Sequence, residues 1–235
     1  MMENFKIDEV YGMHNWPGVE LGKFAIRSGP FFAASDFIEA TISGKGGHAA
    51  KPHETIDPTV IASQIVVALQ TIASRRTDPV EQVVVSITSF ETSSTAFNVI
   101  PQEVKIKGTV RTLDPDIRDL AEKEFLRITE LTAEAMGGSA DARFTRGYPV
   151  MSNSSEQTEF AAKVARDVAG ECAEAPLVMG GEDFAYMLEE RPGAYILLGN
   201  GDSSPVHHPK YNFNDDAIPF GCSWLVELVE QKMPI

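Results

Sequence analysis

The sequence predicts an α/β fold, because segments with strand and helix periodicity alternate along much of the 235-residue chain. Hydrophobic residues make up 43% of the chain and charged residues 23%, as in an ordinary soluble globular protein with a substantial core. The most regular part begins near residue 36, where the elements follow the order βαββαβ. This order is that of a ferredoxin-like unit, in which two helices cover one face of a four-stranded antiparallel sheet.

Two helices of this unit are marked by the same start signal, an aspartate followed by a proline. The aspartate can cap the helix, and the proline suits its first turn. The strands are recognised by alternating apolar residues, because alternate side chains of a strand share one face. In order, the predicted elements are a strand near 36–43, a helix near 57–76, strands at 82–90 and 103–113, a helix that starts at Pro115 and stops at Gly137, and a strand at 140–146.

The segments on either side of this unit are less regular. A short apolar strand is expected to end at Gly12 or Met13 and to present His14 at its tip, where open α/β sheets place their ligands. Packing of His14 under Trp16 explains the local sequence at least equally well. The later segments predict a helix near 156–169, a strand near 177–179 that leads into a glycine turn with Glu182 and Asp183, a buried strand near 193–199 and a helix near 216–232.

Charge and composition exclude several classes of protein. The formal net charge of -14 argues against a surface for nucleic acid or for an anionic membrane, because either would need a basic stripe. The sequence contains no run of 18 apolar residues and does not begin with a signal peptide. Cys172 and Cys222 lie far apart and form no CxxC pair, which predicts a reducing, cytoplasmic location.

The histidines are the first candidates for chemistry, because all five are predicted at loops or strand ends. Neutral imidazole nitrogen suits zinc, and a carboxylate often supplies a further ligand or a base. The spacing is not diagnostic, since there is no HExxH motif and the histidines are far apart in the sequence. Structural or solvated histidines therefore remain an alternative to a metal site. The five are His14, His48, His53, His207 and His208.

Arg111 and Asn98 are candidates for substrate binding. Arg111 lies near the end of a strand, on the face opposite its apolar residues, where a guanidinium can clamp a carboxylate through two parallel hydrogen bonds. A solvated cationic face is the alternative. Asn98 lies in the turn before the same strand, where it either contributes an amide to the site or only caps the turn.

Six motifs taken together resemble the dinuclear-metal amidohydrolase and peptidase family, which includes aminoacylases, hippurate hydrolases, carboxypeptidases and the plant auxin-conjugate hydrolases. Their order along nearly the whole chain carries the resemblance, and the histidine of the first motif makes the hippurate and auxin-conjugate branch the most similar. The motifs are GMHN at 12–15, GKGGHAAKPH at 44–53, NVIP at 98–101, GTVRT at 108–112, GGEDF at 180–184 and HHP at 207–209.

The resemblance implies a truncated zinc-peptidase-like α/β domain, formed by residues 1–33 and 148–235, with a ferredoxin-like lid and dimerisation domain inserted at 34–147. It implies that His14 and His207 are metal ligands, in a site that holds two divalent ions, either zinc or else manganese or cobalt. His48 would reach the partner subunit's active site in a homodimer and stabilise the oxyanion. Asn98 and Arg111 would bind the carboxylate end of a small N-acyl amino acid.

The family's remaining ligands and its general base come from an upstream CGHD motif and a paired Glu-Glu, and neither is present where it is expected. Zinc in a catalytic site needs about three protein ligands and an open position. The leading hypothesis is therefore a metal-dependent amidohydrolase whose site is incomplete in this sequence. A non-catalytic dimerisation and binding fragment of such an enzyme is the alternative, and an α/β domain with structural histidines is a third reading.

Overall fold

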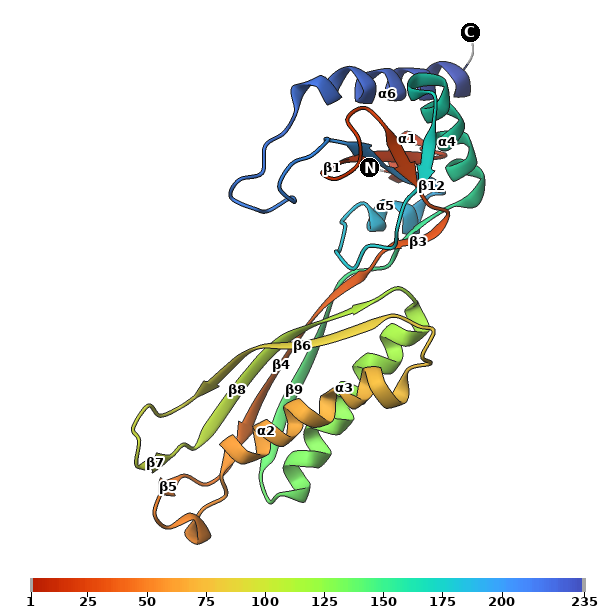
Figure 1. Ribbon diagram of the computed structural model, residues 1–235. Helices are drawn as coiled ribbons and strands as arrows, with labels where there is room; N and C mark the ends of the chain where they lie inside the picture. Colours follow the sequence, from red (N-terminus) through yellow and green to blue (C-terminus); the bar gives the residue numbers. More distant parts are fainter. Residues whose placement is uncertain (1, 234–235) are drawn as a thin grey trace. The chain divides into compact units, whose positions relative to one another are not determined.

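The computed structural model describes residues 2–233 and divides into two compact units, which are described separately (Figure 1). Both units combine helices with β-sheet, so the chain is an α/β protein. Among residues 2–233, the helices lack the combination of length and hydropathy that a membrane span requires. The central unit consists of Ala33–Val150 and Met179–Gly181, and the terminal unit consists of the residues up to Phe32, Met151–Val178 and the residues from Glu182 onward.

The central unit is built on a four-stranded antiparallel sheet with the strand order β6-β8-β4-β9. Ile38 of β4 pairs with Gly108 of β8 on one side and with Phe144 of β9 on the other. A side chain at Gly108 would collide with the backbone oxygen of Ser86, so only glycine allows β6 to approach β8 at this point. The strands are β4 at Ala34–Ser43, β6 at Val83–Thr92, β8 at Glu103–Thr112 and β9 at Ser139–Tyr148.

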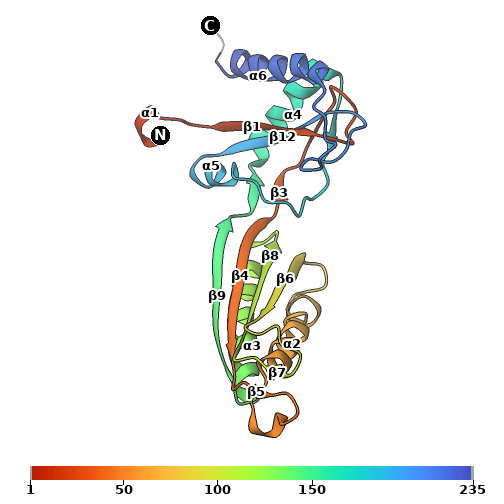
Figure 2. The same cartoon turned by 90° about the vertical axis from the view of Figure 1, so that its left-hand side faces the viewer.

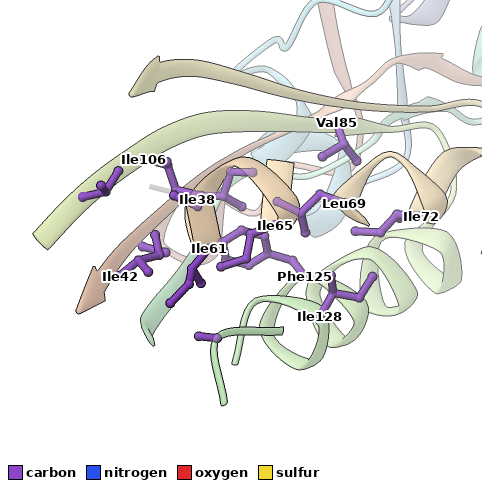
Figure 3. Packing of buried hydrophobic residues seen from close by; sticks show 14 of the residues in the cluster. Ile38, Ile42, Ile61, Ile65, Leu69, Ile72, Val85, Ile106, Phe125 and Ile128 are labelled. Atoms are coloured by element: carbon purple, nitrogen blue, oxygen red, sulfur yellow. The ribbon is translucent and has the colours of Figure 1, made fainter. Parts of the chain in front are cut away.

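Two helices, α2 (Pro58–Leu69) and α3 (Pro115–Ala135), pack on one face of this sheet (Figure 2). Each begins with the predicted cap, since Asp57 Oδ1 accepts from the Thr59 amide at 2.8 Å and Asp114 Oδ1 from the Asp116 amide at 2.8 Å. A short π-helical turn, η2 (Ile72–Arg76), follows α2. Figure 3 shows the core between sheet and helices, which includes Ile38, Ile42, Ile61, Ile65, Leu69, Ile106 and Phe125.

A buried ion pair joins the start of β4, the start of α3 and the end of β9. Asp36 is 0% exposed, and its two oxygens accept from Arg118 Nε at 2.9 Å and Arg118 Nη2 at 2.6 Å. The Gly147 amide also donates to Asp36 Oδ1 at 3.1 Å, and Arg118 Nη2 donates to the Gly147 carbonyl at 3.1 Å. Both charged groups of the pair are thus hydrogen-bonded. The pair lies beside the first residues of β4 and the last residues of β9, the first and last strands of the central sheet in chain order.

A two-stranded ribbon lies at one end of the central sheet (Figure 1). Its strands are β5 (Gly47–His48) and β7 (Val99–Ile100), with Gly47 opposite Ile100 and His48 opposite Val99. The short 3-10 helix η1 (Pro52–Glu54) follows β5. The ribbon therefore brings together two segments of the chain that are about fifty residues apart in the sequence.

The terminal unit contains a mixed four-stranded sheet with the order β1-β12-β2-β11. β1 is parallel to β12, β12 is antiparallel to β2, and β2 is parallel to β11. The indole of Trp224 is buried, stacks on the Phe24 ring and donates to the Ala161 carbonyl at 3.1 Å. The elements are α1 Met2–Phe5, β1 Val10–Trp16, β2 Phe24–Ile26, β3 Gly29–Phe32, β10 Met151–Asn153, α4 Ser155–Ala169, β11 Cys172–Glu174, α5 Ala185–Glu190, β12 Gly193–Gly199, η3 Asp215–Ala217 and α6 Ile218–Lys232.

Two local expectations for the terminal unit were wrong, and two short elements were not expected. β1 does not end at Gly12 or Met13 but continues to Trp16, because it stays paired with β12 as far as Gly199, so His14 lies within the strand. The strand expected before the glycine turn is only an isolated bridge between Phe32 and Val178. Neither the three-residue strand β11 nor the short helix α5 has a sequence pattern long enough to reveal it.

Candidate active site

His14 lies in β1 with one ring nitrogen already engaged. Its Nδ1 is 2.6 Å from the Asn15 carbonyl oxygen. Because a carbonyl oxygen can only accept, Nδ1 carries the proton, and the lone pair of Nε2 is left for another partner. A metal-ligating histidine commonly has this arrangement, with its second nitrogen donating to a backbone carbonyl. His14 therefore has the chemistry of a metal ligand.

Aromatic rings surround the His14 imidazole. The Trp16 ring is 5.6 Å away and the Tyr195 ring 6.5 Å away, both in edge-on geometry. The alternative expectation had His14 stacked under Trp16; the two rings do make contact, but edge-on rather than stacked, and Nε2 stays free. These contacts restrict the rotation of the imidazole. A fixed ring suits both a structural histidine and a metal ligand, so the contacts do not distinguish the two roles.

Glu182 of the glycine turn is connected to this cluster through Tyr195. Burial raises the pKa of the Tyr195 phenol, and the nearby Glu182 carboxylate, to which the phenol is hydrogen-bonded, raises it further. Phe184 packs on the Tyr195 ring with 5.0 Å between the ring centres. The sequence places Glu182 on a glycine turn but does not indicate its tyrosine partner, because that contact depends on how the turn packs on β12.

His207 is exposed in the loop that follows β12. Its φ of +66° lies in the left-handed region, which non-glycine residues adopt uncommonly and often at functional sites. The next residue is held differently, because His208 Nδ1 accepts from the Lys210 amide at 3.1 Å. Among residues 2–233, the His207 ring has no hydrogen-bond partner, whereas the His208 ring is hydrogen-bonded within its own turn.

His48 and Asn98 are brought together by the pairing of β5 with β7. The Ala49 amide donates to the Asn98 carbonyl at 3.0 Å, and both His48 and Asn98 are exposed. The Ala50 amide donates to His48 Nδ1 at 3.1 Å. Because Nδ1 accepts this hydrogen bond, the neutral ring carries its proton on Nε2, so His48 presents a hydrogen-bond donor to the solvent.

Arg111 lies near the far end of β8, away from this ribbon. Its Nη1 donates to Thr109 Oγ1 at 2.6 Å and to the Val110 carbonyl at 3.3 Å. Partial burial lowers the pKa of the guanidinium, and the nearby Asp36 carboxylate opposes this shift. Within residues 2–233, Arg111 forms no salt bridge. A half-buried arginine without a carboxylate partner is suited to binding an anionic group.

The length of β8 separates Arg111 from the pair His48 and Asn98. β7 ends at Ile100, close to the first residue of β8, Glu103, whereas Arg111 is the second-last residue of that strand. With about 3.3 Å per residue, the eight steps from Glu103 to Arg111 span about 26 Å. One small substrate cannot contact all three side chains of the same chain.

The ligand set for a metal ion is partial. Within the part of the chain that the structure describes, no group of three or more His, Cys, Asp or Glu side chains could hold a metal ion. A catalytic zinc site needs about three protein ligands. His14 fits such a site by its tautomer, but the described residues do not complete one.

The comparisons with known proteins agree with the motifs. The profile of the Peptidase family M20/M25/M40 matches residues 1–231, so this chain belongs to that family. It is 36% identical over 227 residues to an N-acetyl-L-cysteine deacetylase of Bacillus subtilis, covering 97% of this chain and 54% of the relative. It is 36% identical over 232 residues to a hippurate hydrolase of Campylobacter jejuni, covering 97% of this chain and 60% of the relative.

Solved structures show the same fold. A dinuclear metal binding peptidase of the M20 family from Bacillus subtilis matches 97% of this chain and 58% of its own, with 28% identity and a TM-score of 0.81. The chain therefore spans little more than half the length of these relatives.

Proposed function

We propose that this chain is part of a metal-dependent amidohydrolase that cleaves the amide bond of small N-acyl amino acids. The reaction class follows the names of its relatives, which include an N-acetyl-L-cysteine deacetylase, a hippurate hydrolase and an IAA-amino acid hydrolase. The observation that carries the proposal is the tautomer of His14, whose Nε2 is left free to bind a metal ion. His207 is the second ligand, and further ligands must complete a site for two divalent ions, zinc or else manganese or cobalt.

Each remaining candidate residue has a role that matches its geometry. His48 donates its Nε2 proton as a hydrogen bond to the oxyanion, because its Nδ1 already accepts from the Ala50 amide. Arg111 binds the substrate carboxylate, and Asn98 contributes its amide beside His48. A divalent ion, when bound, would polarise the scissile carbonyl and activate the attacking water.

We propose further that residues 34–147 form a ferredoxin-like lid and dimerisation domain. Residues 1–33 and 148–235 are part of the catalytic domain into which it is inserted. The strand order and the two helices on one face support the ferredoxin-like arrangement. The distance of about 26 Å between the two ends of β8 supports a homodimer, because His48 and Asn98 can then meet a substrate held by Arg111 of the second copy. Phe97, beside Asn98, is fully exposed, as expected of a side chain that enters a partner.

A cytoplasmic location is part of the same proposal. Cys172 and Cys222 are both free thiols, which fits a reducing compartment.

The proposal is tested by hydrolysis of hippurate and of N-acetyl-L-cysteine by the purified chain with added Zn²⁺, Mn²⁺ or Co²⁺. We expect metal-stimulated release of the free amino acid, which His14→Ala abolishes. His53→Ala is the matched control, because His53 is exposed and its only described ion pair is with Glu54. Equal hydrolysis by the His14→Ala variant and the wild type would refute the proposed role of His14.

A second candidate function is a non-catalytic dimerisation and binding module. It is favoured by the absence of a three-ligand cluster among residues 2–233. The same assay separates the two candidates for this chain by itself, because turnover with added metal fits only the first, whereas dimer formation and binding of N-acyl amino acids without turnover under any metal condition favour the second.

A further inference from the structure

Three polar side chains link the end of β1 to the loop that carries His207. The Tyr211 hydroxyl donates to Asn15 Oδ1 at 2.7 Å, and Asn15 Nδ2 donates to Asn200 Oδ1 at 3.1 Å. Asn200 directly follows β12 and is 3% exposed. Asn15 is also the residue whose carbonyl accepts from His14 Nδ1.

Asn200 extends these contacts along the loop. Its Nδ2 donates to the Asn212 carbonyl at 2.9 Å, and its Oδ1 accepts from the Asn214 amide at 2.8 Å. The loop is held at both of its ends, because Asn200 begins it and also binds its last residues. A nearly buried amide with every polar atom hydrogen-bonded is a rigid anchor.

The part of the loop around the histidines is built on turns that end at Tyr211. The His208 amide donates to the Pro205 carbonyl at 3.1 Å, and the Tyr211 amide donates to the His208 carbonyl at 2.8 Å. The Tyr211 side chain is thus the point at which these turns attach to β1. His207, with its left-handed backbone, lies between Pro205 and Tyr211.

From these contacts we infer that Asn15, Asn200 and Tyr211 form a positioning network that fixes His207 relative to His14. Asn15 is its junction, because its backbone oxygen orients the His14 ring while its side-chain amide holds the loop. The inference rests on the proposed metal-binding role of the two histidines and assigns their alignment to three uncharged side chains. These are positioning residues, since none of them is proposed to touch a metal ion or the substrate.

The test is Tyr211→Phe, which removes only the hydroxyl that binds Asn15. Tyr11→Phe is the matched control. Tyr11 lies in β1, the strand that contains Asn15, but its hydroxyl donates to Glu9 Oε2 at 2.8 Å, near the other end of that strand. Both variants keep the ring that packs in the fold, so thermal unfolding should stay close to that of the wild type. Amide hydrogen exchange over 203–214 reports on the loop, and imidazole NMR during a Zn²⁺ titration reports on the two histidines.

In Tyr211→Phe we expect loop amides to exchange about fivefold faster, as for the loss of one hydrogen bond. We also expect Zn²⁺ to bind about tenfold more weakly, as when an outer-shell partner is lost. Tyr11→Phe should change neither quantity. Equal loop exchange in the two variants would overturn the inference.

The two proposals can fail separately. If Zn²⁺ shifts neither imidazole in the wild type while the Tyr211→Phe loop still exchanges faster, the network stands and the metal-binding role of His14 and His207 is refuted. If Zn²⁺ shifts both imidazoles equally well in all three proteins, the metal-binding role stands and the network is refuted.

Discussion

Replacing Arg118 by methionine should strongly destabilise the central unit. The substitution removes both hydrogen bonds from Arg118 to Asp36 and leaves a carboxylate that is 0% exposed with only the Gly147 amide as a described donor. Loss of one partner of a buried ion pair costs about 3–5 kcal/mol, because the remaining charge is no longer compensated. With a urea dependence of about 2 kcal/mol per M, the unfolding midpoint should fall by about 1.5–2.5 M.

The two tryptophans allow the affected unit to be identified. Trp16 and Trp224 both belong to the terminal unit, so fluorescence follows that unit, whereas far-ultraviolet circular dichroism follows both. We expect Arg118→Met to lower the urea midpoint of the central unit, which circular dichroism detects, and to leave the fluorescence transition of the terminal unit unchanged.

Arg146→Met is the control for Arg118→Met. The Arg146 side chain is 46% exposed and pairs with Asp119 and Glu122 at the surface of the same unit. Exposed pairs contribute at most about 1 kcal/mol, so the midpoint should move little. If both variants lowered the urea midpoint by the same small amount, the role assigned to the buried ion pair would be refuted.

Two further predictions concern ionisation. Since burial and the Glu182 carboxylate raise the pKa of Tyr195, its phenol stays protonated in the folded state at a pH where the unfolded chain has lost that proton. Stability should therefore fall as the pH rises above about 10, the ordinary tyrosine value, and Tyr195→Phe should reduce this slope in urea titrations at pH 9–11. Burial also raises the pKa of the Cys172 thiol to about 11, so at pH 8 an aromatic disulfide reagent should react first with the exposed Cys222. A Cys222→Ser variant that keeps the fast phase would contradict this order.

The four strands of the central sheet and the two helices on its face could be predicted because their signals are local. The alternation of β4 and the Asp-Pro starts of α2 and α3 lie within a few neighbouring residues. The end of β1 could not be predicted in this way, because its pairing with Gly199 depends on a strand about 180 residues later. The isolated sequence of β11, with three residues, is too short to show a period.

For the candidate site, too, local sequence indicated the residues but not the contacts that they make in the folded chain. Residue type and motif order single out His14, His48, Asn98, Arg111 and His207. The tautomers of His14 and His48 could not be predicted, because backbone groups of neighbouring residues set them only in the folded chain. The pairing of β5 with β7 and the links from Asn200 to the His207 loop likewise depend on tertiary structure, since no local pattern joins their sequences.

The most direct test of the proposed site is the amount of zinc bound per chain in equilibrium dialysis at a fixed concentration of free Zn²⁺. The wild type should bind zinc, and His14→Ala and His207→Ala should each lose most of it, because both imidazoles are proposed to hold the same site. His53→Ala should bind as much as the wild type. Equal zinc binding by the wild type, His14→Ala and His207→Ala would contradict the proposed metal site.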